Sequence, residues 1–111
     1  MRWIKVDIRD TLRGKMRYQM TSEEQGIWFS LYCLAGDSKT LGVIEAAPGE
    51  PYPLKFIATQ LRVPLKRLEQ ALKKFEQQGR IILNDGSIHI VDWDKDQYLS
   101  GERAPKIKGG E

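Results

Sequence analysis

The 111-residue chain has few residues that could hold a metal ion, because it contains one cysteine, Cys33, and one histidine, His89. A structural zinc site needs four cysteine, histidine or carboxylate ligands at suitable spacing, so the sequence predicts no zinc site and no cofactor. Cys33 cannot form an internal disulfide. Its place beside Leu31 and Leu34 in a helical apolar pattern predicts a buried, reduced thiol.

Long apolar runs are also missing. No run of about 18 apolar residues occurs, and Arg2, Lys5 and Asp7 interrupt the N-terminus too early for a signal peptide. We therefore expect a cytoplasmic protein without a membrane partner. The length suits one domain, expected over residues 1–99, while residues 100–111 are too poor in apolar side chains to fold and are interpreted as a flexible tail or linker.

Catalytic motifs are missing as well, since neither a phosphate-binding glycine loop nor G-x-S-x-G occurs. Asp92-x-Asp94-x-Asp96 imitates the start of a calcium loop, but Gln97 and Arg103 stand where glycine and glutamate are needed. We interpret these aspartates as solvated residues. The sequence predicts no catalytic residue and no enzyme.

What the chain does contain is helical periodicity. Thr21-Ser22-Glu23-Glu24 matches a capping box and predicts the start of a helix that Gly36 ends. The apolar stripe of this helix comprises Ile27, Trp28, Leu31, Leu34 and Ala35. A weaker pattern, Leu12 and Met16 one turn apart in a stretch that contains Gly14, indicates a short or frayed helix before it.

Two further helices follow with a turn of about three residues between them. Leu54, Ile57, Ala58 and Leu61 recur at helical spacing in the first, and Pro64 restarts the chain as a first-turn residue. The apolar stripe of the second comprises Leu65, Leu68, Leu72 and Phe75, and Gly79 ends it. This order predicts a helix-turn-helix.

Strand patterns surround these helices. Residues 80–83 and 87–92 are rich in β-formers and flank Asn84-Asp85-Gly86, which predicts a hairpin with His89 on its exposed face. Residues 42–46 indicate a short strand, and Ile4, Val6 and Ile8 alternate with charged residues as in a strand. The predicted fold is α+β, a winged helix-turn-helix with three main helices, an N-terminal strand and a C-terminal β-hairpin wing.

The net charge of +3 is divided unevenly along the chain. Residues 2–17 have six basic and two acidic side chains, and residues 62–80 have the same numbers, so each segment carries +4. Residues 21–50 have five acidic side chains and one lysine. Such segregation is typical of a polyanion-binding face with an acidic back, although a basic helix face is more often only solvated.

If the apolar stripe of the second helix faces the core, its polar residues face outward, and a winged helix places this helix in the major groove of duplex DNA. Lys66, Arg67 and Gln70 are then placed for base edges, where arginine pairs with guanine and glutamine with adenine. Phosphate contacts are expected of Arg62, Lys73 and Lys74. The tip of the hairpin carries an acidic residue and is poorly suited to minor-groove insertion.

A family resemblance rests on three parts of the chain. These are Trp3-Ile4-Lys5-Val6 at the start, then Leu68, Ala71, Leu72, Phe75 and Gly79 within residues 62–80, and Ile88-x-Ile90-x-x-Trp93-x-Lys95-x-Gln97 at the end. Together they resemble the N-terminal region of phage replisome organiser proteins, which is similar to the winged-helix N-terminal domain of DnaD-like primosomal proteins. The resemblance implies binding of origin DNA at the start of phage replication and recruitment of a replicative helicase or its loader.

Two other functions fit the same fold. One is an oligomerisation or interaction scaffold of a primosome, for which Trp3, Trp93 and Tyr98 offer an apolar contact surface. Alternatively, such aromatic residues have only a structural role in the core, which we expect of Trp3 and Trp28. The other is a small phage-type transcription regulator, which differs only in the DNA site that it binds.

Overall fold

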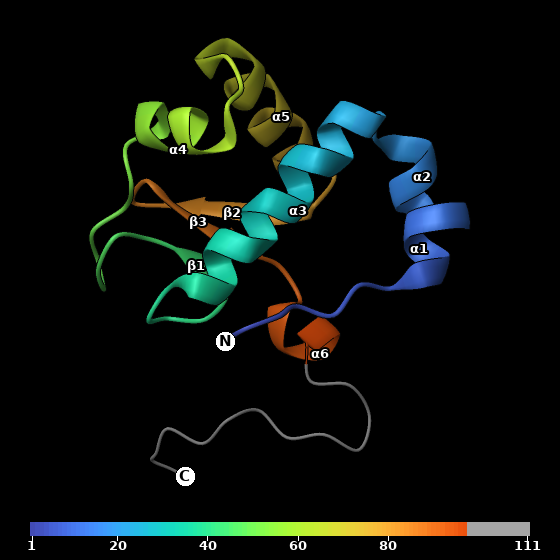
Figure 1. The fold of residues 1–111 in the computed structure, drawn as a ribbon, viewed down its shortest axis with the longest axis horizontal. Helices are drawn as coiled ribbons and strands as arrows, with labels where there is room; N and C mark the ends of the chain where they lie inside the picture. The colour runs from blue at the N-terminus through green and yellow to red at the C-terminus, as the bar shows by residue number, and fades with distance from the viewer. Residues whose placement is uncertain (98–111) are drawn as a thin grey trace, which may run out of the picture.

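The computed structural model describes residues 1–97 (Figure 1). Its elements are α1 (Ile8–Arg13), α2 (Lys15–Gln19), α3 (Ser22–Asp37), β1 (Val43–Ile44), α4 (Leu54–Leu61), α5 (Leu65–Gln77), β2 (Ile81–Asn84), β3 (Ser87–Ile90) and α6 (Trp93–Gln97). The fold is α+β and compatible with a winged helix-turn-helix, with α3, α4 and α5 as the three longest described helices. Tyr98 and the expected tail lie outside the described residues.

The capping box that begins α3 is confirmed. The Thr21 hydroxyl accepts a hydrogen bond from the Glu24 N–H at 3.1 Å, and the Glu24 carboxylate accepts one from the Thr21 N–H at 2.7 Å. These contacts satisfy two donors that a helix start would otherwise leave unpaired. The helix then buries Ile27, Trp28 and Leu31, and it continues one residue beyond Gly36.

The turn between α4 and α5 is residues 62–64. Arg62 has a left-handed φ of 59° and donates its N–H to carbonyls at the end of α4, so it turns the chain sharply. Pro64 then precedes the first turn of α5, which buries Leu68 and Phe75. Leu65 is 38% exposed, so the prediction that it belongs to the buried apolar stripe of α5 is wrong.

The sheet has three antiparallel strands in the order β1-β3-β2, which confirms the predicted hairpin and the short strand before it. Asp85 and Gly86 both have positive φ, 52° and 84°, as a two-residue type I′ turn requires. His89 is half-buried instead of exposed. The reason is that β3 is the central strand, where Val43 and Ile82 flank His89 on both sides.

The predicted N-terminal strand is wrong, because residues 1–7 pair with no strand and Ile8 begins a helix. The side chain of Gln97, in α6, takes the place of a strand partner. Its Oε1 accepts a hydrogen bond from the Lys5 N–H at 2.7 Å, and its Nε2 donates to the Lys5 carbonyl at 3.1 Å. One amide side chain therefore satisfies both backbone groups of Lys5.

The short helix expected around Leu12 and Met16 is present as two pieces, α1 and α2, separated at Gly14. A Cβ on Gly14 would lie 2.8 Å from the Cα of Asp10, so a larger residue would force the backbone to shift at this bend. Met16, a residue of α2, is buried, whereas no residue of α1 is buried. The α1 helix therefore adds surface and little core.

A row of aromatic side chains joins the helices in the core. Trp28 lies 5.2 Å from both Phe75 and Tyr32, and Tyr32 lies 5.2 Å from Trp93, measured between ring centroids. The prediction that Trp28 completes the core is confirmed. Because Trp93 is also buried, it cannot form the contact surface that the scaffold hypothesis assigned to it.

Two predictions of burial are wrong. Trp3 is 75% exposed, because its segment does not pair with the sheet as a strand. Cys33 is exposed, since it lies two residues from both Leu31 and Ala35 and therefore on the opposite side of α3. Residues close to Cys33 in sequence are buried, but Cys33 itself lies on the exposed side of the helix.

Candidate functional site

The outward side of α5 carries a polar row whose spacing follows from the buried stripe. Leu68, Leu72 and Phe75 face the core and are at most 3% exposed. The helix repeats every 3.6 residues, so the positions farthest from this stripe are 66, 70, 73 and 77. We call Lys66, Gln70, Lys73 and Gln77 the outward row; all four are exposed. The row comprises two cations and two amides along three turns.

Arg67 and Lys74 lie beside the outward row, on the flank of α5 that faces the start of α3. Arg67 donates to both oxygens of Glu23 at 2.6 and 2.8 Å, and Lys74 donates to Glu24 at 2.8 Å. We call these four residues the paired flank. The expected separation of a basic face from an acidic back is therefore wrong at this place, because α3 brings its acidic first turn against α5.

Glu24 serves the capping box and the paired flank together. Its partial burial would by itself raise its pKa, but the hydrogen bonds from Lys74 and Thr21 and the charge of Lys74 outweigh this effect, so its pKa is lowered. Glu24 is thus held in its charged form. Lys74 is consequently engaged within the protein, whereas the adjacent Lys73 belongs to the outward row.

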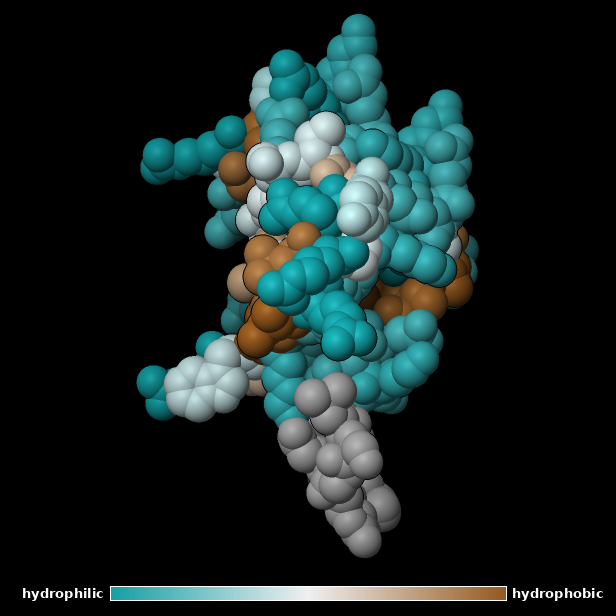
Figure 2. All heavy atoms as spheres, turned by 90° about the vertical axis from the view of Figure 1, so that its right-hand side faces the viewer, coloured by the Kyte–Doolittle hydropathy of each residue, from teal (hydrophilic) through white to brown (hydrophobic). Residues whose placement is uncertain are grey.

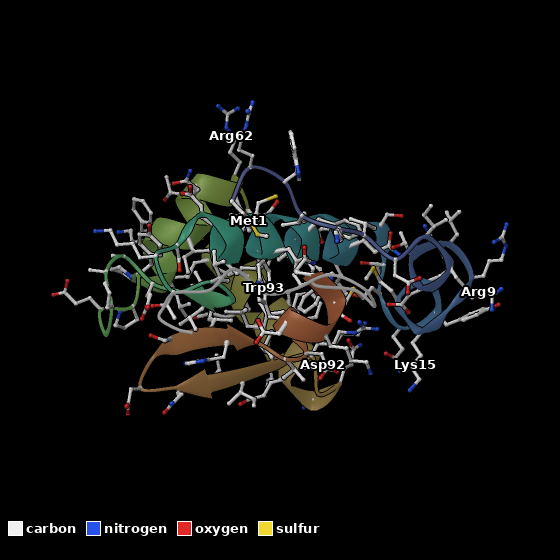
Figure 3. All side chains as sticks on the ribbon, turned by 90° about the horizontal axis from the view of Figure 1, so that it is seen from below. Met1, Arg9, Lys15, Arg62, Asp92 and Trp93 are labelled. Carbon is white, nitrogen blue, oxygen red and sulfur yellow. The ribbon has the colours of Figure 1, made fainter. Side chains whose placement is uncertain are left out.

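Arg62 stands apart from the other candidates, at the turn before α5. It is exposed, and no ion pair to it occurs among residues 1–97. With Met1 and Arg2 it lines a groove of about 530 Å³ that runs between the N-terminal segment and the end of α4. Figure 3 shows Arg62 and Met1 on the same side of the molecule, and the Arg62 side chain points into solvent.

Arg80 contributes to the charge of the basic segment but not to its exposed surface. Its guanidinium lies over the ring of Trp28, 5.8 Å from the centroid, and donates to Gln78 and Gln19. It also lies 3.9 Å from the carboxylate of Asp10. Arg80 therefore connects the hairpin to α1 and α2, and its charge contacts groups of the protein itself.

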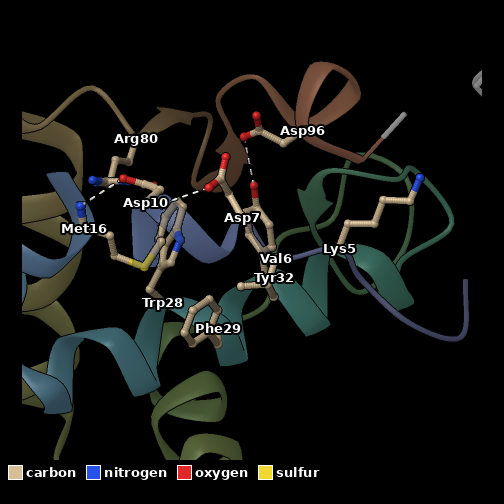
Figure 4. A pocket seen from close by; sticks show the side chains of 10 residues that line it. All are labelled: Lys5, Val6, Asp7, Asp10, Met16, Trp28, Phe29, Tyr32, Arg80 and Asp96. Atoms are coloured by element: carbon tan, nitrogen blue, oxygen red, sulfur yellow. Dashed lines mark hydrogen bonds and ion pairs between the residues drawn. The ribbon is translucent and has the colours of Figure 1, made fainter. Parts of the chain in front are cut away.

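A pocket of about 220 Å³ lies between the N-terminal helices, α3 and α6 (Figure 4). Its polar side chains have structural partners: Asp7 caps α1, Asp10 accepts from the Met16 N–H, and Asp96 accepts from the Tyr32 hydroxyl at 3.2 Å. Burial raises the pKa of Asp96, and the hydrogen bond from Tyr32 opposes this change. The pocket is a junction that fixes α1 and α2 to the core.

Apolar side chains gather on the side of the molecule that α1 and α2 form. Val6, Ile8 and Leu12 are exposed there, and Figure 2 shows hydrophobic atoms surrounded by hydrophilic ones on this side. Among residues 1–97 there is no helix of the length and apolarity needed to cross a membrane. Within the same range, no three histidine, cysteine or acidic residues come together as metal ligands.

Comparison with known proteins gives one finding. The family model described as the N-terminal phage replisome organiser matches residues 3–110. No curated protein and no solved structure matches the chain. The match covers nearly the whole sequence, including both α5 and the N-terminal segment.

The structure places the six residues that the sequence predicts for DNA binding in three settings. Lys66, Gln70 and Lys73 are in the outward row, Arg67 and Lys74 are in the paired flank, and Arg62 is at the turn. The sequence also predicted that Gln77 faces outward, which is confirmed, but it assigned no DNA contact to this residue. Sequence reasoning missed that Arg2 lies across a groove from Arg62, for which the sequence carries no signal.

Proposed function

Because the chain belongs to the N-terminal phage replisome organiser family, whose role is in replication, we propose that it binds duplex DNA as a winged helix-turn-helix when replication starts. The outward row of α5 carries this proposal. Its exposed lysines and amides lie on a helix that the core fixes from behind, as groove binding requires. The protein acts by binding, and not as an enzyme.

Within the major groove, the residues of α5 have different tasks. Lys66 and Gln70, in the first two turns, are placed for base edges, and glutamine can pair with adenine through two hydrogen bonds. Lys73 and Arg62 contact phosphates, which position the protein without reading sequence. The β2–β3 hairpin acts as the wing and rests on the backbone.

Arg67 and Lys74 can also contact DNA if they exchange the carboxylates of Glu23 and Glu24 for phosphates. Ion pairs on a protein surface contribute only about 0 to 1 kcal/mol, so a phosphate can replace the carboxylate of Glu23 at little cost. The pair between Lys74 and Glu24 is more shielded, with 40% and 19% of the two side chains exposed, and it exchanges less readily. We therefore assign the base reading to Gln70 and Lys66 before Arg67.

Duplex binding is tested by fluorescence anisotropy on origin-derived and scrambled duplexes. Gln70→Ala combined with Lys66→Ala should lose about 1 to 3 kcal/mol on the preferred duplex and less on the scrambled one. Lys39→Ala, which removes one exposed lysine far from α5 in sequence, is the control and should bind like the wild type. Equal binding by the double variant and the wild type on both duplexes would contradict the proposal.

A second candidate function is assembly, and the exposed apolar residues of α1 and of the segment before it favour this function. Val6, Ile8 and Leu12 form the kind of surface that binds a replication protein, such as the replicative helicase or its loader, or a second copy of the chain. Light scattering of the protein alone tests self-association. A stable oligomer that Leu12→Asp dissociates would support assembly, and a monomer at all concentrations would remove self-association.

A further inference from the structure

We propose that the chain has a second nucleic-acid site, at which Trp3, Arg2 and Arg62 bind an unpaired nucleotide. The ligand class is single-stranded DNA. Trp3 and Arg2 lie on the N-terminal segment, away from the outward row of α5, so their contacts do not depend on duplex binding. Arg62, at the turn before α5, also belongs to the proposed duplex contacts.

The first observation is that Trp3 is held in solvent by an ordered backbone. On one side, the Met1 amino group donates to the Gly36 carbonyl at 3.1 Å, and the Met1 side chain packs on Gly36. On the other side, Lys5 is fixed by the two hydrogen bonds to Gln97. The segment between these anchors presents an indole that is 75% exposed.

The second observation is a set of cations around this indole. The Arg2 guanidinium lies 5.2 Å from the centroid of the Trp3 ring, so it covers one face of the ring. The exposure of the ring requires that the other face lie in water. Arg2 and Arg62 also line the same groove, beside Met1. Two guanidiniums thus border one groove, and the aromatic ring of Trp3 lies against one of them, Arg2.

These groups match the chemistry of an unpaired nucleotide. A base stacks on an open aromatic face whatever its sequence, and guanidiniums bind the phosphates that flank it through paired hydrogen bonds. A base inside a duplex offers no face to Trp3, so the site selects single strands. A strand that separates from a duplex on α5 could be held here, because Arg62 lies in the turn at which α5 begins.

The same exposed tryptophan provides the readout. Trp28 and Trp93 are buried, so an oligonucleotide that binds in this groove changes the emission of Trp3 and leaves the other two largely unaffected. We expect a dodecamer of thymidine to quench the red-shifted part of the emission. No change in emission on saturation with this oligonucleotide would overturn the proposal.

Variants locate the site with labelled thymidine dodecamer and anisotropy. Stacking contributes about 1 to 3 kcal/mol per base, so Trp3→Ala should weaken binding about 5- to 150-fold, while Trp3→Phe keeps most of the affinity. Arg2→Ala should weaken binding more than Arg9→Ala, its matched control, because Figure 3 shows Arg9 at the far end of the molecule from Met1 and Arg62.

The remaining outcomes decide between ligands. Trp3→Ala should leave the melting temperature and duplex binding unchanged, because Trp3 has no role in the proposed duplex contacts. If the wild type does not bind duplex DNA, the test with single-stranded DNA therefore still stands. Equal binding of single strands by Trp3→Ala and the wild type would overturn the proposal. A blue shift of Trp3 emission with vesicles of phosphatidylserine, together with no change of emission with the oligonucleotide, would also overturn it and would indicate a membrane surface.

Discussion

Residues 2–17 and residues 62–80 carry the same net charge of +4, but the structure uses the two segments differently. In the second segment, Arg67, Lys74 and Arg80 have partners on other elements. Of the exposed cations that remain, Lys66 and Lys73 lie on one side of α5, and Arg62 lies at the turn before it. In the first segment, basic residues alternate with exposed apolar ones on two short helices. Charge counted along a sequence therefore does not measure the charge that a ligand meets.

The segments also differ in what holds them in place. Buried leucines and Phe75 hold α5 in the core, where Phe75 packs on Trp28 of α3. The N-terminal segment is held by the hydrogen bonds of Gln97 and of the Met1 amino group and by the network of Arg80. The attachment of α5 is thus distributed over many buried contacts, whereas that of the N-terminal segment depends on a few hydrogen bonds. Leu68→Ala and Gln97→Ala test this difference, and Glu24→Gln and Glu23→Gln then test the pairs that α5 makes with α3; the four follow in order of decreasing effect on stability.

Leu68→Ala should lower the free energy of unfolding by about 2 to 5 kcal/mol, because it leaves a cavity at a side chain that is 0% exposed. Chemical denaturation measures the change. Lys66→Ala, two residues away on the outward row, should change it by less than about 0.5 kcal/mol. Equal effects of the two variants would mean that the buried side of α5 is assigned wrongly.

Gln97→Ala should cost about 1 to 3 kcal/mol, because it removes the two hydrogen bonds that the Gln97 side chain makes with the backbone of Lys5. Hydrogen exchange at the Lys5 amide should become faster, while exchange in α5 stays slow. Asp94→Ala, an exposed residue of the same helix, is the control. If Lys5 exchanges equally fast in both variants, Gln97 does not hold the N-terminal segment.

Glu24→Gln should cost about 1 kcal/mol at neutral pH, because it weakens the contact with Lys74 while an amide keeps the capping box. The folded-state pKa of Glu24 is below its ordinary value of 4.5. Its charge therefore stabilises the fold above that value, and this contribution is lost as the pH falls through the lowered pKa. Urea denaturation of both proteins at several pH values should show their difference shrink in that range; a constant difference contradicts this account.

Glu23→Gln should change stability by less than about 0.5 kcal/mol, since its pair with Arg67 is exposed on both sides. Its effect on duplex DNA should be larger. The variant releases Arg67 and removes a negative charge, so we expect affinity to rise by up to about fivefold. Unchanged affinity would place the paired flank outside the DNA interface.

Local patterns predicted most of the fold. Thr21 and Glu24 predicted the start of α3, and Asp85-Gly86 predicted the hairpin, because each depends on neighbours in sequence. The N-terminal strand failed for the opposite reason: Gln97 lies 92 residues from Lys5, and nothing in the sequence connects them. The outward row was predictable from helical spacing, whereas the pairs of Arg67 and Lys74 with α3 required the packing of two helices.

Lys73 and Lys74 offer the most direct test of the central claim that the outward row of α5 binds duplex DNA. The measurement is the slope of log affinity against log salt concentration for the wild type, Lys73→Ala and Lys74→Ala. Each phosphate that the protein neutralises contributes about −0.9 to this slope. We predict that Lys73→Ala reduces the steepness by about 0.9 and that Lys74→Ala, already paired with Glu24, reduces it by less. An unchanged slope in Lys73→Ala would contradict the claim.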